Sequence, residues 1–185
     1  MNFTKTTNEL FKKYGLKPEN VIVAGACGAD EKISLIYYLL LAYEFARKNL
    51  LKGNLTASSY ACGLVLDDDS VHFGVNFNNT RNEISSICAE RLAMLEAFNS
   101  KVKEYRPELK QKFNYKIKYV LMASYKKEGA FWVDKITPCA DCLSWFDKSE
   151  NLSADTKICS LKINSENKII LDIQYIEKFL PLRNL

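Results

Sequence analysis

Residues 58–78 read SSYACGLVLDDDSVHFGVNFN, two largely apolar stretches separated by three consecutive aspartates. In the second stretch every second residue is apolar, and the residues between are polar or glycine. A period of two is typical of a strand with one buried and one exposed face. The segment therefore predicts a β-hairpin, with Val71, Phe73, Val75 and Phe77 on the buried side of its second strand.

Helices and strands are expected on both sides of this hairpin. VIVAGA (21–26) predicts a short strand or a buried turn, and Ser85 or Ser86 is expected to cap the second long helix. The other expected elements are helices at 31–51, 84–99 and from 137, a central strand at 118–125, strands at 156–163 and 168–173, and a short closing helix at 174–181.

The composition fits a single domain with a sizeable core, since the 185 residues are 48% hydrophobic and 26% charged. A net charge of +4 does not by itself indicate a nucleic-acid partner. The longest apolar stretch, 33–46, is shorter than the roughly 20 residues that span a bilayer. The first residues lack the apolar region of a secretory signal. We therefore expect a cytoplasmic protein with reduced cysteines.

Six cysteines and one histidine limit the metal sites that this chain can form. Reduced cysteines in close pairs bind metal or carry chemistry more often than they form disulfides. A single histidine excludes two-histidine zinc sites, so a zinc site must consist mainly of thiolates. Cys139 and Cys142, in TPCADC (137–142), are three positions apart at a predicted helix start, where both can reach one ion.

A third thiol at a helix start is Cys88, in the stretch CAE (88–90). Glu90 would then face the remaining position of the ion. Three thiolates with a nearby carboxylate fit a catalytic zinc site, which leaves one position open for water, better than a structural site with four ligands. A lone C-x-x-C pair is a weak signal by itself. The three other cysteines, Cys27, Cys62 and Cys159, are expected to be small buried hydrophobes.

The two cysteine segments together resemble the signature H-x-E…P-C-x-x-C of zinc deaminases, whose first ligand is histidine or cysteine. In its all-thiolate form the sequence is similar to the cytidine deaminase family, small enzymes that act on free nucleosides and are related to blasticidin S deaminase. Residues 58–79 resemble the first hairpin of that family, and FLPLRNL (179–185) resembles its C-terminal segment. The similarity covers about residues 38–185.

The resemblance implies a role for nine residues. The zinc ligands are Cys88, Cys139 and Cys142, the catalytic residue is Glu90, the substrate contacts are Tyr60, Asn76, Asn78 and Ala89, and Arg91 supports the metal thiolates.

The same resemblance implies an α/β fold in three layers, α/β/α, with a mixed five-stranded sheet and zinc between two helix starts. Residues 1–185 would form one domain, with an N-terminal extension (1–30) and a basic connector (100–117). The implied reaction is the hydrolytic deamination of cytidine or deoxycytidine, with release of ammonia, as in pyrimidine salvage. The enzyme would be a hydrolase acting on a cyclic amidine. Since neighbouring subunits complete one another's sites in the family, a homotetramer or homodimer is implied.

Several departures from the family leave the substrate open. Asn78 replaces the ribose-binding glutamate, Ala140 replaces a glycine, and an aromatic residue near the C-terminus is absent. Asn76 and Asn78 also fit ordinary turn chemistry, and His72 fits a surface or hydrogen-bonded structural role. One alternative is the same chemistry on a modified nucleoside or nucleoside antibiotic. Others are a nucleic-acid-binding or editing deaminase, suggested by the basic connector, and a zinc-stabilised interaction module without turnover.

Overall fold

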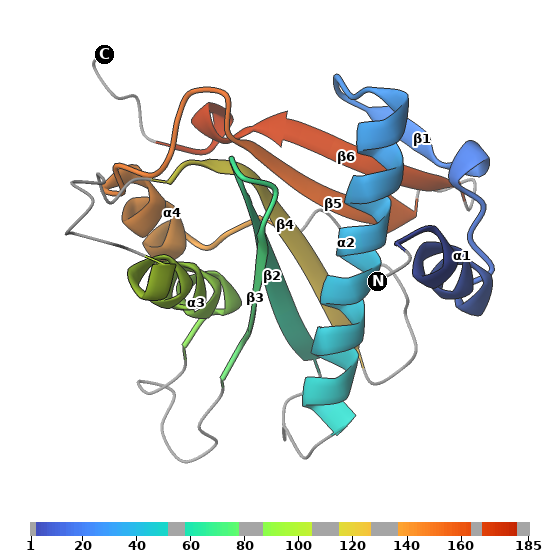
Figure 1. Ribbon diagram of the computed structural model, residues 1–185, viewed down its shortest axis with the longest axis horizontal. Coiled ribbons are helices and arrows are strands. Elements are labelled where there is room, and N and C mark those ends of the chain that lie inside the picture. Colours follow the sequence, from blue (N-terminus) through green and yellow to red (C-terminus); the bar gives the residue numbers. More distant parts are fainter. Residues whose placement is uncertain are drawn as a thin grey trace.

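A mixed β-sheet forms the middle layer of the chain, and helices cover both of its faces (Figure 1). The computed structural model describes residues 3–51, 58–77, 87–104, 115–126, 137–163 and 168–180. Within these residues the sheet has the order β1-β6-β5-β4-β2-β3. The strands are β1 (Ile22–Ala24), β2 (Ser58–Leu66), β3 (Val71–Val75), β4 (Ile117–Lys126), β5 (Lys157–Ile163) and β6 (Ile169–Tyr175).

The helices form the two outer layers of the α/β/α arrangement. They are α1 (Phe3–Lys13), α2 (Ala29–Leu51), α3 (Ala89–Glu104) and α4 (Ala140–Asp147), with the 3-10 turns η1 (Pro18–Asn20) and η4 (Ile176–Lys178). Helices α1 and α2 lie on one side of the sheet, and α3 and α4 lie on the other (Figure 1). Among the described residues, no helix has the length and apolar character needed to cross a membrane.

The predicted hairpin over 58–78 is confirmed, with β2 antiparallel to β3. The sheet is mixed, because β4 runs antiparallel to β2 and parallel to β5. The expected count of five strands is wrong by one. VIVAGA (21–26) supplies a three-residue edge strand, β1, which pairs in parallel with β6. This pairing joins distant parts of the chain, so local sequence could not distinguish the strand from a turn.

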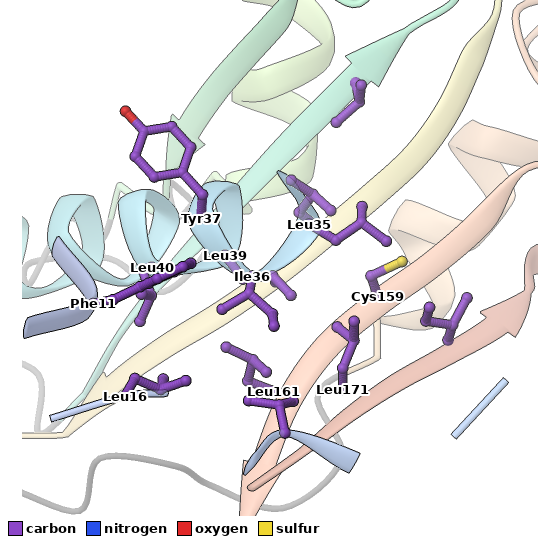
Figure 2. Packing of buried hydrophobic residues seen from close by; sticks show 14 residues of the cluster. Phe11, Leu16, Leu35, Ile36, Tyr37, Leu39, Leu40, Cys159, Leu161 and Leu171 are labelled. Atoms are coloured by element: carbon purple, nitrogen blue, oxygen red, sulfur yellow. The ribbon is translucent and has the colours of Figure 1, made fainter. Parts of the chain in front are cut away.

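Both faces of the central strands are buried, which explains their continuous apolar runs. In β4, Val120 and Met122 join the core beneath α3 and α4, whereas Leu121 joins the core beneath α2. Figure 2 shows the core beneath α2, where side chains of α2 meet those of β5 and β6. Phe11 and Leu16 reach the same core from the N-terminal segment, so that segment packs onto the sheet layer.

A partly buried ion pair also joins α1 to α2. The carboxylate of Glu44, a buried residue of α2, contacts the Lys13 ammonium of α1 and lies 3.0 Å from the Arg47 guanidinium. Hydrogen bonds from these two cations outweigh the effect of burial and lower the pKa of Glu44. The two cations therefore compensate the negative charge of a carboxylate that is only partly hydrated. The Lys13 contact also holds α1 against α2.

The apolar residues of β3 pack against the cores on the α2 side of the sheet, as predicted, but Phe77 is exposed and the opposite face of the strand is buried rather than solvated. His72 and Gly74 are buried, whereas Val71, Phe73 and Val75 are half-buried. The His72 ring contacts the Glu96 carboxylate through Nδ1 and lies 3.1 Å from Ser70 Oγ through Nε2. The histidine is therefore a hydrogen-bonded one, as expected, and these contacts compensate its burial.

Helix α3 rests directly on β3 at Gly74. A Cβ atom at this position would lie 2.3 Å from the carbonyl oxygen of Ala89 and 2.3 Å from the nitrogen of Ala93. Both of these are backbone atoms of the helix, so they cannot rotate away as a side chain would. Glycine at position 74 therefore sets the distance between α3 and the sheet.

We expect Gly74→Ala to lower the free energy of unfolding by about 2–3 kcal/mol, because the new methyl group must push the α3 backbone away from the sheet. Urea unfolding followed by circular dichroism measures this loss. Gly28→Ala is the matched control, since a Cβ there meets no atom closer than 4.0 Å, and its effect should stay within about 0.5 kcal/mol. Equal stability of the two variants would contradict the close contact.

Candidate metal centre

Two helices on the same side of the sheet begin immediately after a cysteine. The Leu92 N–H donates to the carbonyl of Cys88 at 3.3 Å before α3, and the Leu143 N–H donates to the carbonyl of Cys139 at 2.9 Å before α4. Each cysteine thus occupies the position that precedes the first helical turn. The free N–H groups of a helix N-terminus favour negative charge, so both ends suit thiolates.

The expected start of α3 near residue 84 is wrong. Ile87 forms a β-bridge with Phe77, with reciprocal backbone hydrogen bonds of 2.8 and 2.9 Å. The chain is therefore held in an extended form until it reaches Cys88, and the helix begins at Ala89. Ser85 and Ser86, the expected caps, lie outside the described residues.

Three cysteine sulfurs gather between these helix starts. The Sγ atoms of Cys88, Cys139 and Cys142 all lie within 4.8 Å of one another, and those of Cys88 and Cys139 are 3.8 Å apart. A disulfide bond would require about 2.05 Å. Two thiolates bound to one tetrahedral zinc at about 2.3 Å lie about 3.8 Å from each other. The spacing therefore fits three ligands of one metal ion.

The electrostatics of the cluster favour a cation. Burial raises the pKa of the Cys142 thiol far above its ordinary value, and the nearby Glu90 carboxylate adds to this effect. Burial also raises the pKa of Cys88. Without a positive charge nearby, burial thus favours the protonated thiols of Cys88 and Cys142. A divalent cation among the sulfurs would provide the opposite charge and release those protons.

Glu90 lies beside both cysteine segments. It is the second residue of α3 and only 5% exposed. Burial raises its pKa, and hydrogen bonds from its own backbone, from the Cys142 thiol and from the Cys139 backbone partly offset this effect. A carboxyl group with a raised pKa, placed next to a metal-binding cluster, is suited to accept and donate protons.

Arg91 connects α3 to α4. One terminal nitrogen of its guanidinium lies 3.9 Å from the Asp141 carboxylate, and its central carbon lies 4.8 Å from the centre of the Trp145 ring. The Nε atom is buried and has no hydrogen-bond partner among the described residues. The cysteine motif did not indicate Asp141 or Trp145. Their separation of four residues, which puts both on one side of α4, is the only local signal for them.

The expected substrate contacts are distributed around the hairpin end. Asn76 is 6% exposed, and its Oδ1 accepts hydrogen bonds from the Tyr60 N–H at 2.7 Å and from Ser59 Oγ at 3.0 Å. Tyr60 is 39% exposed, and Ala89 is buried against Gly74. Asn76 therefore holds the strand ends together, whatever else it contacts. Asn78 lies outside the described residues.

Searches with family models and among curated proteins find no match for this chain. Among solved structures, the chain is similar to several bacterial cytidine deaminases. The enzyme from Mycobacterium leprae is 16% identical with a TM-score of 0.45, over 76% of this chain and 98% of that one.

Two further structures give comparable values. The cytidine deaminase from Burkholderia pseudomallei is 17% identical with a TM-score of 0.48, over 76% of this chain and 94% of that one. The cytidine deaminase from Bacillus anthracis is 14% identical with a TM-score of 0.48, over 80% and 89%. Similarities of this size do not assign the chain to a family, and we therefore infer its function from the residues of the cluster.

Proposed function

We propose that the chain is a zinc-dependent hydrolase that converts free cytidine or deoxycytidine and water into uridine or deoxyuridine and ammonia. One observation carries the proposal. The sulfurs of three cysteines lie within 4.8 Å of one another at two helix starts, and Glu90 lies on the first turn of one of these helices. The order C-x-E…P-C-x-x-C is the signature of zinc deaminases in its all-cysteine form.

The donor set supports zinc as the metal. Three thiolates with an open fourth position are the arrangement of a catalytic zinc site rather than of a structural one. Zinc bound there would supply Lewis-acid activation of a water molecule. The cysteines must stay reduced to bind it, so a cytoplasmic location belongs to the same proposal.

Glu90 would move the protons of the reaction. Its carboxylate would accept a proton from the attacking water and deliver it to ring N3. It would then accept the remaining proton of the hydroxyl group added at C4 and transfer it to the departing amino group, so that the carbonyl of the product forms and ammonia leaves. Burial makes the carboxylate a stronger base than an exposed glutamate, since its pKa is raised. The positive charge of Arg91 and the N-termini of α3 and α4 would offset the negative charge of three thiolates.

The nucleoside would bind against the end of the β2–β3 hairpin. The exposed ring of Tyr60 would cover the substrate, and the backbone at Ala89 would orient the pyrimidine. Since Asn76 Oδ1 already accepts two hydrogen bonds from the protein, a contact with the sugar would come from the amide nitrogen of Asn76. Asn78 would add a second amide to the same contact.

Self-association as a homodimer or homotetramer is a further part of the proposal. Leu95, Phe98 and Val102 are exposed large hydrophobic residues of α3. Their spacing of three and four residues puts them on one side of the helix. A contiguous apolar stripe on a helix surface is typical of an interaction site, and a second copy of the chain would cover it.

Purified protein should contain about one zinc ion per chain. Cys142→Ala should remove most of the zinc, because two sulfurs cannot hold the ion as three do. Metal analysis by plasma mass spectrometry measures both. Cys159→Ala is the matched control, since Cys159 is an equally buried cysteine in the core beneath α2. Full zinc content in Cys142→Ala would contradict the assignment of the ligands.

Glu90→Gln should reduce the deamination of cytidine by about 10²–10⁴-fold while zinc content stays the same, because the amide cannot carry the proton. The fall in absorbance of the cytosine ring measures the rate. Glu96→Gln, on the same helix, is the control and should retain the wild-type rate. Wild-type turnover in Glu90→Gln would refute the catalytic role. A zinc-loaded wild type that is inactive on both nucleosides would instead indicate a modified cytosine nucleoside as substrate.

The stripe on α3 predicts a dimer or larger assembly in light scattering coupled to gel filtration. Phe98→Glu should shift the protein to monomers, because a charge cannot be buried without a partner. Phe45→Glu, which alters an exposed aromatic side chain of α2, should leave the assembly intact. A monomeric wild type would refute self-association.

A further inference from the structure

We infer that Trp145 is a positioning residue that holds the Cys139 and Cys142 half of the cluster against Cys88 by stacking on Arg91. This inference rests on the metal site proposed above. The deaminase signature ends at Cys142 and assigns no role to a tryptophan three residues later. The role follows from the contacts between α3 and α4.

Arg91 reaches α4 at two points on one side of that helix. Arg91 is the third residue of α3, and its guanidinium carbon lies 4.8 Å from the centre of the indole ring of Trp145. Its terminal nitrogen lies 3.9 Å from the carboxylate of Asp141. The distance to the ring lies within the range of a cation–π interaction, for which tryptophan is the best partner.

Such a contact is needed because other forces push the two helix starts apart. Both N-termini carry partial positive charge and converge on the same cluster, so the two helix ends repel each other. Cys88 and Cys139 are 51 positions apart in the sequence. Contacts between α3 and α4, namely the side chains that cross between them and the shared core that contains Phe146, must therefore maintain the distance between the two cysteine segments.

The exposure of Trp145 supports this role. The residue is 45% exposed although tryptophan is usually well buried, whereas the Arg91 side chain is 29% exposed and its Nε is buried. The indole thus acts as a cover over the guanidinium. Removing the ring would hydrate Arg91 and allow its side chain to leave the space between the helices. The three sulfurs would then no longer be held at the distances that one metal ion requires.

The test is a cobalt(II) titration of the metal-free protein in competition with a chelator. Trp145→Ala should weaken cobalt binding about fivefold, equivalent to about 1 kcal/mol. The visible spectrum of its cobalt–thiolate complex should also change, because the sulfurs lie less regularly around the ion. Trp145→Phe keeps a flat ring and should restore most of the affinity. Trp145→Leu fills the space without an aromatic ring and should weaken cobalt binding as Trp145→Ala does. This variant tests the same contact if Trp145→Ala fails to fold.

Phe45→Ala is the matched control. Phe45 is also a partly exposed aromatic residue on a helix, and it packs against Phe73 with ring centres 5.0 Å apart. It belongs to α2, which lies on the other side of the sheet from α3 and α4 (Figure 1). It should bind cobalt with wild-type affinity and spectrum. A general effect of losing a surface ring on stability would appear in this variant as well.

The outcomes separate the two proposals. If the alanine and leucine variants bind cobalt with wild-type affinity and spectrum, the positioning role of Trp145 is refuted and the metal site stands. If the wild-type protein shows no cobalt–thiolate absorption, the metal site is refuted and the role of Trp145 falls with it.

Discussion

The contact of helix α3 with strand β3 at Gly74 is the constraint on which the rest of the site depends. No side chain separates the two elements, since Ala89 and Ala93 bring their backbone atoms directly to the glycine. The β-bridge between Phe77 and Ile87 then leads the chain to the first turn of the helix. The sheet therefore fixes Cys88 and Glu90, the half of the cluster that carries the carboxylate, through backbone contacts rather than through flexible side chains.

The second half of the cluster is held by packing and by charge. Phe146 of α4 is fully buried in the core that α3 also covers, and Cys142 is buried on the same helix. Arg91 adds a cationic contact across the gap between the helices. The cluster brings several potential anions together, the cysteine thiolates and the Glu90 carboxylate. Burying these charges is unfavourable unless a cation compensates them. A metal ion bound among the three sulfurs would supply that compensating charge.

Local patterns in the sequence predicted much of this structure. The alternation and the acidic turn of 58–78 gave the hairpin, and the apolar run of 118–125 gave the central strand, because both patterns reflect the immediate surroundings of each strand. The two cysteine segments were identified by their spacing and by their place near predicted helix starts. Such local patterns are enough to predict an element whose structure depends on a few neighbouring residues.

The predictions failed where residues distant in the sequence determine the local structure. Hydropathy assigned His72 and Gly74 to the exposed face, but hydrogen bonds compensate the histidine and the glycine is needed beneath a helix. Pairing with β6 makes β1 a strand, and pairing with Phe77 delays the start of α3. Trp145 was missed for the same reason, since its partner lies on another helix.

The most direct test of the account is zinc K-edge X-ray absorption of the purified protein. A catalytic site predicts three sulfur ligands at about 2.3 Å and one lighter ligand at about 2.0–2.2 Å. Three sulfurs and one lighter ligand would support the account, whereas four sulfurs, or no sulfur at all, would contradict it.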